Sequence, residues 1–235
     1  MERRVAAVAA ERAGRRAFPG VIRHHAGDRV FLVRQDDHAA HSGRLASQWS
    51  RPPVPFQPAL RAIELHDAGW TLLDDRPHPL PDGRAPHLFD FESGLTTPAW
   101  RRSVAIARDR GPREALVVSG HFSRFDPAFA TEQAPLKAAW RLGVDPEWEQ
   151  AAVDILRVCD GLSLRLLCRP GELQPLRGYR YQAGTVSPWP FAADRIDDFV
   201  AARALPDRIW DSAGEFEAAY QAAPVVRLEL VLRPA

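Results

Sequence analysis

The stretch that decides the fold is Asp145–Cys168, DPEWEQAAVDILRVCDGLSLRLLC, the longest segment with helical periodicity. It begins with Asp145 and Pro146, because aspartate caps free backbone N–H groups and proline suits the first turn of a helix. Asp160 interrupts its apolar face. The residues four and seven positions away are all apolar: Val153, Leu156, Leu164 and Leu167. A carboxylate on that face must be paired, hydrogen bonded or bound to a cation. A buried salt bridge and a metal ligand are both open interpretations.

A second polar pair, His66 and Asp67, lies in another apolar pattern. The segment from Pro58 to Trp70 is predicted to be one helix, with the proline in its first turn. His66 shares a helix face with Ala59, Ala62 and Ile63. Asp67 shares another with Leu60, Ile63 and Trp70. One histidine on such a face is usually a core residue. An adjacent imidazole and carboxylate that both face inward also suit a divalent transition metal such as Mn, Fe, Zn or Ni.

Two further histidines extend this set. His38 opens a predicted helix that runs to Trp49, and His121 ends an apolar helix that starts at Pro112. The order along the chain is therefore His, His-Asp, His and Asp. Each group comes from a separate predicted helix, so helix packing can bring them together. His41, three residues after His38, is an alternative ligand.

These motifs resemble the HD-domain superfamily of metal-dependent hydrolases, in which a helical bundle supplies a histidine, a His-Asp pair and a late aspartate. The same motifs also resemble an uncharacterised bacterial family known only as a domain of unknown function, over roughly residues 18–192. The matching segments are Gln35–Gly43, His66–Trp70, Val118–Phe122 and Cys159–Leu164. The resemblance implies the metal ligands His38, His66, Asp67 and Asp160, with His121 as a further ligand or a neighbour of the ligands.

The resemblance also implies an activity. It is that of a metal-dependent phosphohydrolase acting on a small phosphorylated metabolite or nucleotide, with Asp67 and His121 as catalytic residues. Asp67 would orient a metal-bound water, and His121 would stabilise the leaving group. The alternatives are a non-catalytic regulatory or scaffold domain and an HD-type di-iron oxygenase. The oxygenase needs a second metal, and His121 lacks the following histidine that many two-metal members have. Three arginines are candidates to face a phosphate: Arg34, Arg44 and Arg124.

Composition narrows the class of protein. The chain has 235 residues, of which 46% are hydrophobic and 26% charged, as in globular proteins. Because 31 basic and 30 acidic residues give a net charge of +1, no nucleic-acid partner is expected. No apolar run is long enough to span a bilayer, so no membrane partner is expected. Cys159 and Cys168 would be about 13 Å apart in one helix, too far for a disulfide. Reduced thiols predict a cytoplasmic protein.

The sequence predicts a mainly α fold, an HD-domain-like helical bundle with a small antiparallel β-sheet formed by the N- and C-terminal segments. Residues 1–17 are expected to be a flexible leader. A single HD-like domain is expected to cover residues 18–235. Its predicted parts are a helical core of about 36–168 and terminal strands at about 20–34, 178–186 and 225–232.

Residues 74–97 contain four prolines and are predicted to be a long loop. We expect this loop to border the mouth of the pocket, since loops on a rigid scaffold often carry specificity. His87 in this loop, and the acidic pairs Asp74–Asp75 and Asp197–Asp198, are predicted to be solvent exposed.

Overall fold

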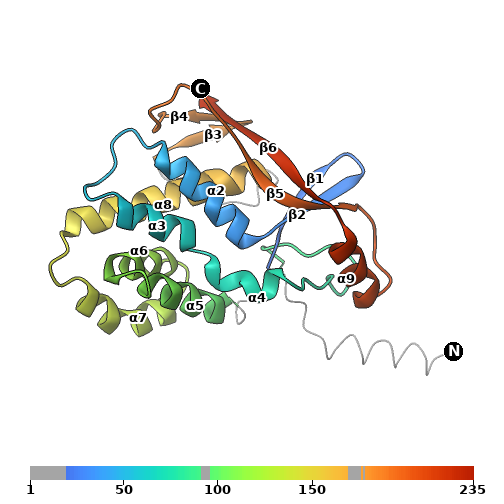
Figure 1. The fold of residues 1–235 in the computed structure, drawn as a ribbon, viewed down its shortest axis with the longest axis horizontal. Helices are drawn as coiled ribbons and strands as arrows, with labels where there is room; N and C mark the ends of the chain where they lie inside the picture. The colour runs from blue at the N-terminus through green and yellow to red at the C-terminus, as the bar shows by residue number, and fades with distance from the viewer. Residues whose placement is uncertain (1–19, 91–95, 169–175, 177) are drawn as a thin grey trace.

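A computed structural model describes residues 20–90, 96–168, 176 and 178–235. The predicted leader, residues 1–17, lies outside the described residues. Most helices gather on one side of a curled sheet, while the last helix lies apart from them (Figure 1). The helices are α2 (Gln35–Ser47), α3 (Gln57–Leu65), the 3₁₀ turn η1 (Ala68–Trp70), α4 (Thr71–Asp74), α5 (Thr96–Arg108), α6 (Pro112–Phe122), α7 (Pro127–Trp140), α8 (Pro146–Leu167) and α9 (Ala213–Ala222).

Helix α8 forms as its sequence predicts. The Asp145 carboxylate accepts a hydrogen bond from the backbone N–H of Glu147, at 3.0 Å, and Pro146 occupies the first turn. Glu147 and Glu149 near the start and Arg165 in the last turn complement the helix dipole. Asp160 lies in the middle of this helix and is 6% exposed. The helix therefore carries its aspartate into the interior.

The sheet contains six strands among the described residues, in the order β1-β2-β5-β6-β4-β3. Neighbouring strands are antiparallel except β4 and β6, which are parallel. The strands are β1 (Ile22–Ala26), β2 (Arg29–Val33), β3 (Arg180–Gln182), β4 (Thr185–Ser187), β5 (Ile196–Pro206) and β6 (Val225–Pro234).

The predicted fold class, a mainly α bundle with a small antiparallel sheet, is therefore wrong. Strands form near all three predicted places, but the predicted strand 178–186 is a hairpin of β3 and β4. The N- and C-terminal strands also do not pair directly, because β5 lies between β2 and β6. Local propensity does not predict β5, because the segment is rich in alanine and contains two aspartates, which are poor strand formers. Its residues Val200, Ala202 and Ala204 are nevertheless buried. Burial against distant parts of the chain, rather than local propensity, makes this segment a strand.

Both faces of the sheet are covered near β2. Leu32 packs in a cluster with Phe216 of α9, whereas Val33 packs with Leu167 at the end of α8. Adjacent residues in a strand point to opposite faces. Helices α8 and α9 therefore lie on opposite sides of the sheet.

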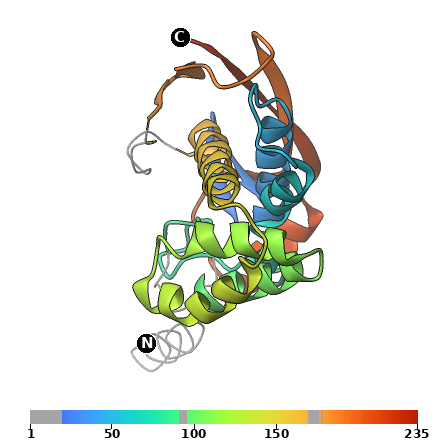
Figure 2. The same cartoon turned by 90° about the vertical axis from the view of Figure 1, so that its left-hand side faces the viewer.

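Helix α8 is the centre of the helical layer. Figure 2 shows it nearly end-on, with α2 and α3 beside it and the long strands beyond them. Helix α2 contacts both α8 and β5, and α8 also contacts α3 and α6. His38, His121 and Asp160 lie on α2, α6 and α8, and His66 and Asp67 directly follow α3, so the packing of the helical layer sets their positions.

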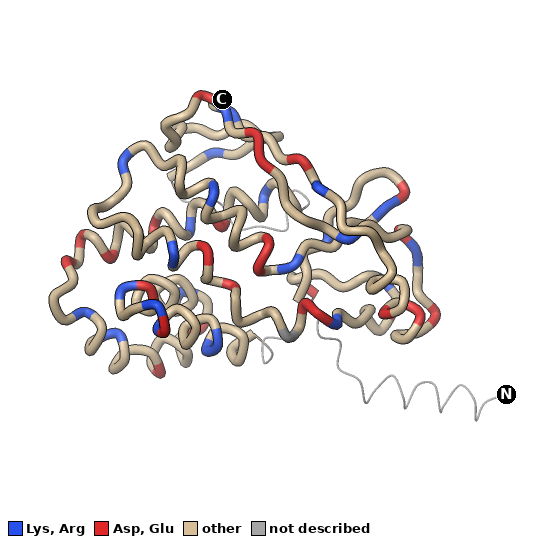
Figure 3. The backbone as a smooth tube through the Cα atoms, viewed as in Figure 1, with Lys and Arg blue, Asp and Glu red and all other residues tan. Residues whose placement is uncertain are grey.

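Three other sequence expectations concern properties of the whole chain. Within the described ranges, no helix is both long and apolar enough to cross a membrane. Cys159 and Cys168 are buried and do not form a disulfide with each other. Figure 3 shows basic and acidic residues interspersed over helices and strands alike.

Candidate metal centre

The His66-Asp67 pair lies at a break between helices. The structure ends α3 at Leu65, so the prediction of one helix through Trp70 is wrong. The chain instead turns through η1, where the backbone N–H of Gly69 donates to the hydroxyl of Ser103 on α5, at 2.9 Å. This contact holds the turn, and with it the His-Asp pair, against α5.

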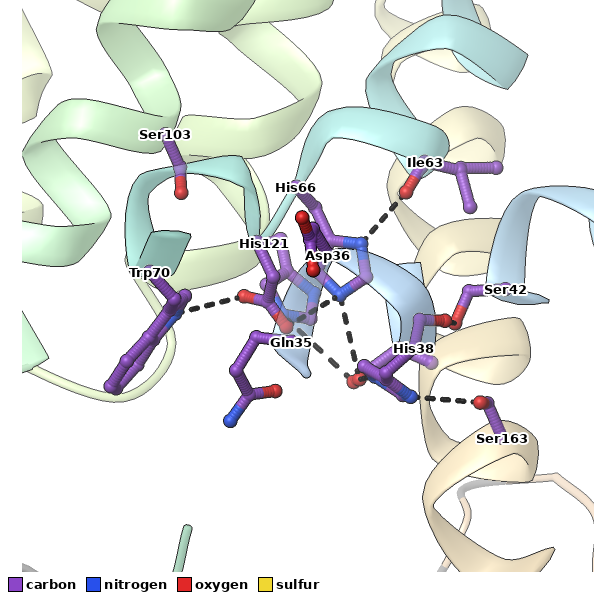
Figure 4. A network of polar contacts seen from close by, with 12 residues as sticks. Gln35, Asp36, His38, Ser42, Ile63, His66, Trp70, Ser103, His121 and Ser163 are labelled. Atoms are coloured by element: carbon purple, nitrogen blue, oxygen red, sulfur yellow. Dashed lines mark hydrogen bonds and ion pairs between the residues drawn. The ribbon is translucent and has the colours of Figure 1, made fainter. Parts of the chain in front are cut away.

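Five side chains converge next to this turn. We call His38, His66, Asp67, His121 and Asp160 the His–Asp cluster. Their closest approaches between side chains are 3.1 Å from His38 Nε2 to Asp160 Oδ1 and 3.2 Å from His66 Nε2 to Asp67 Oδ2. Asp160 also lies 3.7 Å from His66 Nε2 and 3.9 Å from His121 Nε2. All five residues are buried, and Figure 4 shows the three imidazole rings around one point. The structure thus brings together every predicted site residue.

Hydrogen bonds outside the cluster orient its members. The ring of His66 must carry a hydrogen on Nδ1, because this nitrogen lies 2.7 Å from the carbonyl oxygen of Ile63, which only accepts. The indole N–H of Trp70 donates to Asp67 Oδ1 at 3.1 Å, so Oδ2 is the oxygen that faces His66. Such partners commonly orient metal ligands and leave the second atom of each side chain for the ion.

The two buried carboxylates of the cluster require a compensating positive charge. Burial alone lowers the pKa of His66, but the Asp67 and Asp160 carboxylates outweigh it and raise the pKa to about 10. Burial disfavours the Asp160 anion, yet its contacts with His38 and His66 hold the pKa of Asp160 well below its usual range. Burial also lowers the pKa of His121 well below its ordinary value. A proton on His66 therefore compensates two buried carboxylates where a metal ion would serve equally well.

An arginine lies beside the cluster. Arg124 Nη2 is 3.4 Å from Asp160 Oδ2, and its guanidinium lies over the ring of Phe125, 4.3 Å from the centroid. Asp160 therefore has an arginine partner, as the interpretation of a buried salt bridge requires, but it is also surrounded by three imidazoles. A salt bridge accounts for only part of its surroundings.

Two overlapping groups in the cluster could hold a metal ion. One is His38, His66 and Asp67, and the other is His66, His121 and Asp160; within each, the ligand atoms lie within 4.8 Å of one another. Adjacent ligands of a tetrahedral ion with bonds of about 2.1 Å are about 3.4 Å apart, close to the observed separations. Within the described part of the chain, His66 Nε2 makes no hydrogen bond. A buried nitrogen that faces two carboxylates, at 3.2 Å and 3.7 Å, is an arrangement that suits a divalent ion.

His38 rather than His41 faces the cluster. The Nδ1 atom of His41 lies 2.7 Å from the hydroxyl of Ser163, on the other side of His38. Ser163 is not among the site residues predicted from the sequence, although it lies three residues after Asp160 and hence on the same helix face. Trp70 is a second residue that the sequence does not single out for the site, although it lies three residues after Asp67 and donates to it.

Three residues predicted to be exposed are buried or nearly so. Asp74 is fully buried, and it accepts a hydrogen bond from the backbone N–H of Gln35 at 2.8 Å. The side chain of Asp198 is 13% exposed and pairs with Arg44 at 2.8 Å. His87 is 2% exposed. Their burial depends on partners that are distant in the sequence.

The described part of the predicted loop, residues 75–90, is attached to β1. His87 Nδ1 accepts a hydrogen bond from the backbone N–H of Arg23, and Leu88 N–H donates to the carbonyl of Val21. Residues 91–95 of the loop lie outside the described residues. That the loop borders the site stays a prediction.

A comparison with known protein families gives one match. A family model described as "Protein of unknown function (DUF3891)" matches residues 21–207, which is most of the chain. The chain belongs to this family. The DUF3891 match includes the whole His–Asp cluster and ends after β5, and it confirms the predicted resemblance to a domain of unknown function. No curated protein and no solved structure gave a significant match.

Proposed function

We propose that this DUF3891 protein is a metal-dependent phosphohydrolase of the HD type, which binds one divalent transition metal in the His–Asp cluster. The observation that carries the proposal is the convergence of three imidazoles and two carboxylates, buried together, with His66 Nε2 left without a hydrogen bond. Mn, Fe, Ni and Zn all accept this mixture of nitrogen and oxygen ligands. The proposed substrate is a small phosphorylated metabolite or nucleotide.

Each residue of the cluster has a proposed role. His38, His66, Asp67 and Asp160 would hold the metal, and the chemistry it would supply is a lower pKa for a bound water and polarisation of a phosphoryl oxygen. Asp67 would bind through Oδ2, since Trp70 holds Oδ1, and would help to orient the attacking water. His121 is neutral because burial lowers its pKa, so it can donate a hydrogen bond to the leaving oxygen.

Arg124 supports an anionic substrate. Of the three arginines considered for phosphate binding, Arg34 pairs with Asp36 at 3.0 Å, and Arg44 pairs with Asp198. Arg124 lies instead beside Asp160 of the cluster. Guanidinium groups match phosphate oxygens in geometry and charge. The basic and acidic residues that alternate along the chain in Figure 3 favour a small phosphate ester over a nucleic acid.

Metal addition is expected to stabilise the protein. An ion present at 1,000 times its dissociation constant contributes about 4 kcal/mol, which raises Tm by roughly 8–16 °C. Affinity should increase with pH up to about 10, the pKa of His66, because the metal must displace the proton of this ring. Thermal melts with EDTA or added Mn or Zn, and titration calorimetry in two buffers to count released protons, measure both effects.

Elemental analysis of protein purified without a chelator or a histidine tag completes this test. One Mn, Ni, Zn or Fe per chain agrees with the proposal. Two irons per chain would favour the di-iron oxygenase. Absence of metal together with an unchanged Tm would contradict the proposal and favour a regulatory or scaffold domain, in which the three histidines and Arg124 hold Asp160.

Replacing Arg124 with Gln is expected to reduce kcat/KM for phosphomonoesters without weakening metal binding. A charge-assisted hydrogen bond contributes about 2 kcal/mol, which corresponds to about 30-fold. Hydrolysis of a panel of phosphomonoesters and nucleotides by the metal-loaded protein measures the effect. Arg101→Gln is the matched control, because Arg101 pairs with Glu132 on the surface. Equal kcat/KM values for both variants would exclude Arg124 from substrate binding.

A further inference from the structure

Ser163 contacts two buried histidines at once. Its hydroxyl oxygen lies 2.8 Å from His38 Nδ1 and 2.7 Å from His41 Nδ1. All three residues are fully buried. A serine hydroxyl has one hydrogen to donate, so with two neutral rings it donates to one nitrogen and accepts from the other. The direction of this pair of hydrogen bonds therefore determines where the hydrogen of each ring lies.

Asp198 on β5 favours one direction. Its Oδ2 atom lies 3.8 Å from His41 Nε2, and Arg44 holds the carboxylate in place. Burial lowers the pKa of His41 to about 3, so the ring is neutral and carries a single hydrogen. With that hydrogen on Nε2 it faces the carboxylate, whereas on Nδ1 it would leave a lone pair facing a negative charge. In the metal-free protein His38 Nε2 carries a hydrogen for Asp160 at 3.1 Å, which imposes the opposite direction. A metal ion bound to His38 Nε2 would take the place of that hydrogen, and Asp198 then places the hydrogen of His41 on Nε2.

The rest follows from donor and acceptor counting. His41 Nδ1 is then an acceptor, so the Ser163 hydroxyl donates to it. The oxygen of Ser163 accepts in turn from His38 Nδ1–H. This leaves Nε2 of His38, the nitrogen 3.1 Å from Asp160, as the one that can bind a metal.

We propose that Asp198, His41 and Ser163 form a chain of positioning residues that selects Nε2 of His38 as the metal-binding nitrogen. The inference rests on the proposed metal centre and extends it to β5. None of the three residues belongs to the His–Asp cluster. Hydrogen bonds of this kind fix the tautomer and orientation of a ligating histidine, and their loss typically lowers metal affinity 10–100-fold.

The decisive variants are Asp198→Asn and Ser163→Ala. Asp198→Asn changes the residue that is farthest from His38 in this series of contacts. The neighbouring Asp197→Asn is its matched control, because Asp197 is exposed and pairs with Arg195. Ser163→Thr keeps a hydroxyl and is the conservative variant. Titration calorimetry with Zn is expected to show about 10–100-fold weaker binding for Asp198→Asn and Ser163→Ala. Asp197→Asn and Ser163→Thr are expected to bind Zn as the wild type does.

Nitrogen-15 NMR of the histidine rings, recorded with Zn and in EDTA, gives a readout that does not depend on activity. The Zn-loaded wild type is expected to carry hydrogens on His41 Nε2 and His38 Nδ1, and Asp198→Asn to lose the first of these assignments. In EDTA the hydrogen of His38 is expected on Nε2, where it faces Asp160. A hydrogen on His41 Nδ1 in the Zn-loaded wild type would overturn the inference, as would Asp198→Asn that binds Zn like Asp197→Asn while the wild type binds Zn. A wild type that binds no metal would contradict the proposed function together with the inference that rests on it.

Discussion

Asp160→Asn is expected to lower metal affinity by more than 100-fold, beyond the 10–100-fold loss typical of residues that only support a ligand. The substitution keeps the size of the side chain and removes its charge. Asp160 lies within 3.9 Å of nitrogens on His38, His66 and His121, so every ion held by these residues would contact it. Titration calorimetry with Mn and Zn measures the loss, and thermal melts should show that metal no longer raises Tm.

The matched control is Asp154→Asn in the same helix. Asp154 is exposed and lies 3.6 Å from Arg157, so its loss should change stability by no more than about 0.5 kcal/mol and leave metal binding intact. A buried ion pair without metal predicts a different pattern. Asp160→Asn would then leave Arg124 unpaired and cost about 3–5 kcal/mol, equally with EDTA and with metal. That pattern, beside a wild-type Tm that metal does not move, would defeat the metal-site proposal.

Gly69→Ala is expected to destabilise the protein by about 3 kcal/mol or more, which lowers Tm by roughly 6–12 °C. A Cβ atom on Gly69 would lie 2.0 Å from the backbone oxygen of Ala99 and 2.6 Å from the backbone nitrogen of Ser103. Both are backbone atoms of α5 and cannot rotate away. The turn must therefore separate from α5, which displaces Asp67 and weakens metal binding as well. Thermal or urea unfolding measures the loss of stability.

Gly214→Ala is the control for this substitution. A Cβ on Gly214, in the first turn of α9, would meet no atom of the described residues within 4 Å. Alanine there should stabilise the protein by about 0.5 kcal/mol, because it restricts the unfolded chain. If Gly69→Ala unfolds at the same temperature as the wild type, the close approach of the turn to α5 is not required for the fold.

Local pattern alone was enough to locate the helices and the cluster. Asp145 and Pro146 start α8 as predicted, and Pro112 starts α6. Caps and first-turn prolines act on neighbouring backbone groups, so their effect can be recognised without knowing the fold. Asp160 and His66 were recognisable for a related reason, since a polar residue on an apolar helix face needs a partner wherever that helix packs.

Tertiary structure alone decided the sheet, the end of α3 and the wider hydrogen-bond network. β5 becomes an interior strand because β2, far from it in sequence, and β6, which follows it after α9, supply its backbone hydrogen bonds. Helix α3 ends at Leu65 because the following turn packs against α5. Asp198 approaches His41 only once β5 lies against α2. These features depend on contacts between distant segments, whose gain in burial and hydrogen bonding outweighs local propensity, and no local pattern encodes them.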